Sequence, residues 1–147
     1  MDKLLDDMKI KKKKKKKESD FFENSLPKTY IPKGLTEKDK KLQLQSIKDK
    51  KDRPKVESFK SKRSGWVKKF ENKYKTKIND KSFINKNILK NKGQELIIDK
   101  GMGAYYSSGS RPNQTAYSWG YGRLASVILG GKARQIDKKI WDKYKIV

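Results

Sequence analysis

The sequence has 147 residues, of which 40 are Lys or Arg and 17 are Asp or Glu, so its formal net charge is +23. Self-repulsion of this size disfavours a compact isolated monomer and favours binding to polyanions such as nucleic acid, an anionic membrane or an acidic protein surface. The absence of Cys and His excludes disulfides and thiolate zinc sites and removes the commonest general base.

The N-terminal part of the chain is predicted to be a basic arm, residues 1–57, that is largely extended or disordered. It contains seven consecutive lysines, whose mutual repulsion disfavours an isolated helix. This run is either a solvated tail or a segment that becomes ordered on a polyanion or between subunits. The residues expected to bind polyanions in and beside the arm are Lys11, Lys12, Lys13, Lys14, Lys15, Lys16, Lys17, Lys60, Lys62 and Arg63.

The first seven residues lack the basic-then-apolar order of a secretory signal. No apolar run approaches the roughly 20 residues of a membrane-spanning helix. We therefore expect a protein that is made in the cytosol and then stays soluble or joins an assembly.

Two short helices are expected in the middle of the chain. Thr36, with Asp39 three residues on, is a suitable N-cap for a helix that ends before Pro54. Further along, an aromatic stripe recurs at helical spacing, at Trp66, Phe70 and Tyr74. We interpret this stripe as core packing, with base stacking on nucleic acid as the alternative.

Two more helical segments are expected before residue 101. One runs from about Ser82 to Lys92, with Gly93 just past its end. The other covers one or two turns from Gln94 and is stopped by Gly101.

The segment 101–115 is rich in Gly, Ser, Pro and Asn, so it is predicted to be a loop or a short strand with tight turns. Thr115 can cap a helix from Ala116 to about Leu129. Gly120 and Gly122 inside that helix indicate close approach of another backbone.

The end of the chain is expected to form a last amphipathic helix that includes Ile136, Ile140, Trp141 and Tyr144 and is capped by Asp137.

Known phosphate-binding motifs are matched only in part. Residues 120–125 fit the dinucleotide pattern, but no apolar strand precedes them and the glycines lie in a predicted helix. The segment that ends at residues 130–133 has Ser126 where a phosphate loop has its first Gly, and Ala133 where it has Ser or Thr.

The stretch 102–131 contains no acid, so two-metal and glycosidase chemistry have no carboxylates there. No enzyme activity, cofactor or metal is expected.

The segments 103–115 (GAYYSSGSRPNQT), 118–126 (SWGYGRLAS) and 130–133 (GGKA) resemble an uncharacterised domain family of large DNA viruses of algae and protists and of some phages. The likeness extends back through residues 30–35 and 58–63 and covers about residues 28–140; the polylysine run lies outside it. The resemblance implies a viral origin and carries no established activity.

The sequence therefore predicts a helix-dominated fold, mainly α or small α+β. Short helices in a compact domain, residues 58–147, surround the Gly/Ser/Pro loop, and the basic arm precedes them. We expect a non-enzymatic virion protein, a minor capsid or internal capsid-associated component whose basic arm binds acidic surfaces of other capsid proteins, packaged DNA, or both. A non-structural viral nucleic-acid-binding protein is the first alternative. The second is a nucleotide- or phosphate-dependent enzyme acting through Tyr106, Ser108, Arg111 and Asn113.

Specific contacts with a partner are expected from the loop and the helix after it. Arg111 and Arg123 stand among uncharged polar and aromatic neighbours, where a guanidinium can form bidentate or stacked pairs. The alternative is that both bind carbonyl groups of the loop itself. The full set of expected docking residues is Tyr105, Tyr106, Arg111, Asn113, Gln114 and Arg123.

Overall fold

The computed structural model describes residues 21–60 and 64–147, which are dominated by helices and contain no β-strand. The predicted helix-dominated fold class is confirmed. Lys11 to Lys17, Lys62 and Arg63 lie outside the described residues. The elements in chain order are the 3-10 helix η1 (Lys28–Tyr30) and the α-helices α2 (Glu37–Lys48), α3 (Gly65–Tyr74), α4 (Lys81–Asn87), α5 (Asn91–Ser108), α6 (Ala116–Ile128), α7 (Lys132–Ile136) and α8 (Lys138–Tyr144).

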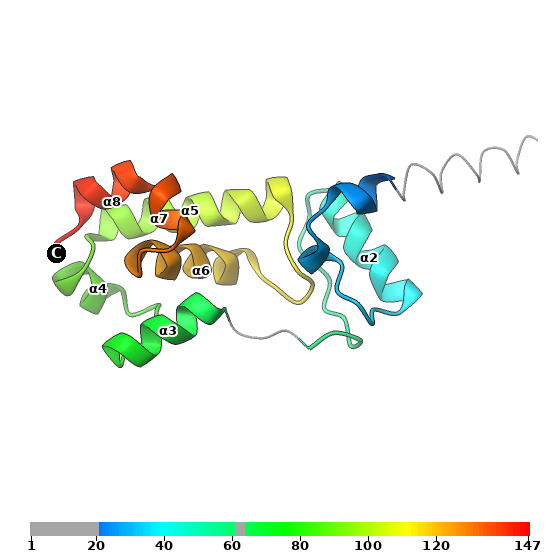
Figure 1. Cartoon of the computed structure of the whole chain (residues 1–147), viewed down its shortest axis with the longest axis horizontal. Helices are drawn as coiled ribbons and strands as arrows, with labels where there is room; N and C mark the ends of the chain where they lie inside the picture. Colours follow the sequence, from blue (N-terminus) through cyan, green and yellow to red (C-terminus); the bar gives the residue numbers. More distant parts are fainter. Residues whose placement is uncertain (1–20, 61–63) are drawn as a thin grey trace, which may run out of the picture.

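Two antiparallel helices, α5 and α6, form the centre of the molecule (Figure 1). Helix α3 packs against α6, α8 packs against α5, and α2 lies near the loop that joins α5 to α6. The buried apolar side chains gather between these helices and include Phe70 of α3, Ile97 of α5, Leu124 of α6 and Trp141 of α8. Burial of such side chains supplies the main favourable free energy of folding.

Helix α5 is longer than predicted, because it continues through Gly101 and Gly103 to Ser108. The prediction that Gly101 stops a helix and that residues 101–108 belong to a loop or strand is therefore wrong. A Cβ atom on Gly101 would lie 2.6 Å from the Cα of Gly120, and one on Gly120 would lie 2.9 Å from the carbonyl oxygen of Ile98. Gly101 is thus a contact point between two helices. The predicted close backbone approach is confirmed at Gly120. It is wrong at Gly122, where, among the described residues, a Cβ atom would meet only the Ser64 side chain, at 3.5 Å from its Oγ.

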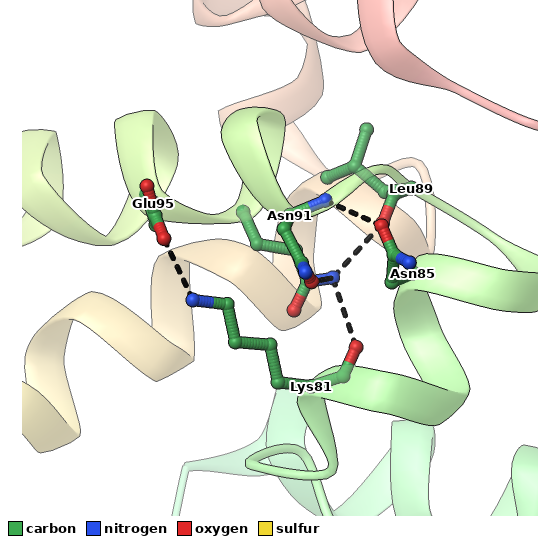
Figure 2. A network of polar contacts seen from close by, with 6 residues as sticks. Lys81, Asn85, Leu89, Asn91 and Glu95 are labelled. Atoms are coloured by element: carbon green, nitrogen blue, oxygen red, sulfur yellow. Dashed lines mark hydrogen bonds and ion pairs between the residues drawn. The ribbon is translucent and has the colours of Figure 1, made fainter.

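Helix α4 ends at Asn87, and α5 begins at Asn91, so the expected helix from Ser82 to Lys92 is interrupted. Polar side chains stabilise this junction (Figure 2). The Asn85 side chain accepts a hydrogen bond from the Asn91 amide at 2.8 Å, and Gln94 Nε2 donates to the Leu89 carbonyl at 2.9 Å. Gly93 therefore does not end a helix; it lies in the first turn of α5, where a Cβ would be 2.7 Å from Tyr144 Cβ.

The C-terminal segment contains two short helices, α7 and α8, which meet at Asp137. Asp137 occupies the N-cap position of α8, but its side chain makes no capping hydrogen bond. The prediction that it caps this helix is wrong, because its carboxylate pairs with Arg123 and Lys100.

Residues 21–57, which composition assigns to the arm, contain the predicted helix after Thr36. The Thr36 hydroxyl accepts a hydrogen bond from the Asp39 amide at 3.2 Å, which confirms the predicted N-cap. On α2, the buried Gln43 donates through Nε2 to the carbonyls of Tyr30 at 2.9 Å and Ser110 at 2.7 Å. Helix α2 is therefore joined by hydrogen bonds to the loop after α5.

Candidate functional site

The loop between α5 and α6, residues 109–115, is held in place largely by Asn113. Its Oδ1 accepts a hydrogen bond from the Val56 amide at 2.6 Å, and its Nδ2 donates to the Phe59 carbonyl at 2.6 Å and to the Val56 carbonyl at 3.2 Å. The backbone φ of Asn113 is 65°, a left-handed conformation that Asn tolerates better than most residues. Asn113 thus clamps the segment 54–59 against the loop.

Two adjacent tyrosines at the end of α5 also bind the chain itself. The buried Tyr105 hydroxyl donates to the Gln114 carbonyl at 2.8 Å and accepts from the Arg53 amide at 2.7 Å. The Tyr106 hydroxyl donates to Asp52 Oδ1 at 2.7 Å, and this bond, with partial burial and the Asp52 charge, raises the pKa of Tyr106. The side-chain oxygen of Gln114 accepts from the Ser118 hydroxyl at 2.9 Å.

Arg123, on α6, forms a bidentate ion pair with Asp137. Its Nε and Nη2 lie 2.7 and 2.9 Å from the two carboxylate oxygens, and Lys100 Nζ lies 3.1 Å from Oδ1. Burial alone would raise the pKa of Asp137, but the hydrogen bonds and charges of Arg123 and Lys100 outweigh it and leave the pKa below its usual value. Arg123 therefore holds α6 to the start of α8 and does not bind loop carbonyls.

A groove of about 380 Å³ is lined by residues of α3, α6 and α7, by Gly101 of α5 and by the loop after α5. Its cations are Arg111 from the loop, Arg123 from α6 and Lys132 from α7. No acidic residue is found among the described residues that line it. Two tryptophans also line the groove, Trp66, which is exposed, and Trp119, which is half-buried.

The turn before α7 explains how Trp66 comes to line this groove. A Cβ atom on Gly131 would lie 2.6 Å from the Trp66 ring and 2.5 Å from Ser126 Oγ, so only glycine leaves room for both side chains. Trp66 keeps 37% of its surface exposed, while Phe70 of the same stripe is fully buried. The predicted core packing of the stripe therefore holds for Phe70, whereas Trp66 lies at the edge of the core.

A second hollow, of about 580 Å³, adjoins the groove, since Ser64, Gln114 and Ser118 line both. Lys77 is the cation in its lining, and again no acid occurs among the described lining residues. The two hollows together make a surface beside the N-terminal half of α6 whose described lining residues include four cations and no acid.

The structure separates the expected docking residues into groups. Tyr105, Asn113 and Gln114 mainly hold the loop together, whereas Arg111 and Arg123 line the groove. Lys60, one of the residues expected to bind polyanions, is exposed at the edge of the described segment. Sequence reasoning did not select Trp66 or Lys132 as groove residues. No linear pattern unites them with Arg111, because the three come from separate segments that tertiary packing brings to one groove.

Two features of the described residues concern metal ions and membranes. They contain no group of three or more His, Cys, Asp or Glu side chains that could hold a metal ion. Within them, no helix has both the length and the apolar character needed to cross a membrane.

These features define a helix-dominated, strongly basic protein with a cation-lined groove. Residues 27–143 match the sequence profile of a family described as "Family of unknown function (DUF5824)", and the chain belongs to this family. The resemblance to an uncharacterised domain family is thereby confirmed, and the polylysine run lies outside the matched residues. The comparisons found no significant match to a curated protein or to a solved structure.

Proposed function

We propose that this protein is a non-enzymatic structural component of a virus particle, a minor capsid or internal capsid-associated protein that binds polyanions. Its partners would be packaged DNA and acidic surfaces of other capsid proteins, met in the virion after synthesis in the host cytoplasm. The viral setting is supported by the resemblance of residues 103–115 and 118–126 to a domain of large DNA viruses.

The observation that carries this proposal is the charge imbalance of the folded part. The described residues include 29 Lys and Arg against 12 Asp and Glu. At one carboxylate for each cation, more than half of these cations therefore have no carboxylate to pair with among the described residues. Such a surface attracts polyanions at long range and releases bound counterions on contact with nucleic acid.

Side chains in and beside the loop form hydrogen bonds within the protein itself, which supports a structural role over a catalytic one. Tyr106 and Asn113, two groups that an enzyme site here would use, bind Asp52 and the segment 54–59. A nucleophile or proton donor needs freedom to meet its substrate. These side chains already have partners within the protein.

Binding to duplex DNA tests the polyanion part of the proposal. Fluorescence anisotropy with a labelled duplex of arbitrary sequence should show binding that weakens steeply with salt, because each neutralised phosphate releases a counterion. Replacing Lys11 to Lys17 by Ser should flatten the salt slope. No binding even at low salt would refute the proposal.

Mass spectrometry of purified particles tests the structural part. The protein should be present at a stable ratio to the major capsid protein. DNA binding without incorporation would instead favour the non-structural nucleic-acid-binding protein. A large rise in melting temperature with a nucleotide, together with turnover of that nucleotide, would favour the phosphate-dependent enzyme.

A further inference from the structure

Two of the cations that line the groove have no partner in the described part of the chain. Neither the Arg111 guanidinium nor the Lys132 ammonium forms a hydrogen bond or an ion pair with a described residue. Arg123, the third cation, is paired with Asp137 and keeps 20% of its side chain exposed. The groove therefore presents positive charge that is not neutralised from within.

The same groove provides aromatic surface beside these cations. Trp66 is partly exposed, and Lys69 Nζ lies over its ring, 4.9 Å from the ring centre. Trp119 contributes a second, half-buried indole to the lining. Exposed indoles next to unpaired cations are the combination by which proteins bind single-stranded nucleic acid, since the cations bind phosphate and the rings stack on unpaired bases.

We propose that this groove binds one nucleotide unit of a single-stranded nucleic acid. Arg111 and Lys132 bind its phosphate, and the base lies against the indole of Trp66. The volume of about 380 Å³ falls within the range of small-ligand sites. A paired base of a duplex cannot leave its stack without cost, and a run of acidic residues alone offers no ring to cover the indole. This inference deepens the proposed function and rests on it.

The test uses the full chain and an oligothymidylate of about 12 nucleotides at roughly 0.3 M NaCl, where non-specific attraction to the basic surface is weakened. Arg111→Gln should raise the Kd about tenfold and Lys132→Gln about fivefold, because each removes a charge-assisted contact with phosphate. The matched control is Lys86→Gln, which removes the same charge from an exposed lysine of α4 that does not line the groove. It should change the Kd less than about twofold.

Competition identifies the ligand chemistry. Thymidine monophosphate should displace the oligonucleotide and quench tryptophan fluorescence, and inorganic phosphate should do both less well. Quenching by the mononucleotide should fall in Trp66→Phe, which removes the proposed reporter. If the mononucleotide binds as tightly as the oligonucleotide, a free nucleotide rather than a strand is the ligand, and the proposal of a strand site is wrong.

Two results would overturn the inference while leaving the proposed function intact. One is equal weakening by Arg111→Gln and Lys86→Gln, which would mean diffuse electrostatic binding. The other is stronger competition by polyglutamate than by the oligonucleotide, which would assign the groove to an acidic protein. If the wild-type protein bound none of these polyanions, the proposed function itself would fail. Unchanged thermal unfolding of each variant confirms that binding, not folding, is measured.

Discussion

The close contact between α5 and α6 means that replacing Gly101 or Gly103 by Ala should change the stability of the protein in opposite directions, although the two residues are only two positions apart. Gly101→Ala places a Cβ 2.6 Å from the Cα of Gly120, a separation that packed atoms do not adopt. Gly103→Ala meets no atom within 4 Å. Both residues lie inside α5, so both substitutions gain the same helix propensity. Only the first must push two helix backbones apart.

The magnitudes follow from these two effects. Replacing Gly by Ala inside a helix stabilises it by about 1 kcal/mol. Forcing an extra carbon into a tight contact costs typically 1–3 kcal/mol, and more where backbone must move. We therefore expect Gly103→Ala to raise the free energy of unfolding by about 0.5–1 kcal/mol. Gly101→Ala should lower it by about 1–2 kcal/mol.

Urea unfolding followed by far-ultraviolet circular dichroism measures both variants against the wild type. Gly120→Ala should behave like Gly101→Ala, since its Cβ would lie 2.9 Å from the Ile98 carbonyl oxygen. Equal stabilisation by Gly101→Ala and Gly103→Ala would refute the close helix contact. It would mean that α5 and α6 are further apart than described.

Two further predictions concern residues that connect separate segments. Asn113→Ala should lower the free energy of unfolding by roughly 2–4 kcal/mol, because Val56 and Phe59 lose their hydrogen-bond partner and Ala tolerates the left-handed backbone poorly. Asn113→Gly relieves only the backbone conformation, so in urea unfolding it should recover part of this loss. An equal loss of stability in both variants would show that the backbone conformation does not matter. The pKa of Asp137 is lowered on folding, so its stabilising contribution is complete above the ordinary carboxyl range and is lost as pH falls through the folded value. Stability measured from pH 7 to about pH 2 should therefore decline in acid, and Arg123→Gln should reduce this decline. An unchanged acid decline in that variant would mean that other carboxylates dominate it.

Several features that depend only on neighbouring residues in the sequence were predicted correctly. Thr36 and Thr115 were predicted as N-caps, and the hydroxyl of each accepts the expected backbone hydrogen bond. A capping residue acts on an amide two or three positions ahead, so its effect is readable from neighbours in the sequence. The helical spacing of Trp66, Phe70 and Tyr74 is equally local, and it correctly predicted α3.

The sequence by itself therefore determined the helical class, the starts of α2 and α6 and the basic charge, because these depend on residue types and near neighbours. Only the tertiary structure decided that α5 passes through Gly101, that Asp137 pairs with Arg123, and that Trp66, Arg111 and Lys132 line one groove. Gly is common at helix ends. Inside α5, however, Gly101 is needed because the backbone of α6 lies so close that only a hydrogen atom fits in place of a side chain. Contacts between segments distant in sequence depend on how whole helices pack, and no short sequence pattern encodes that arrangement.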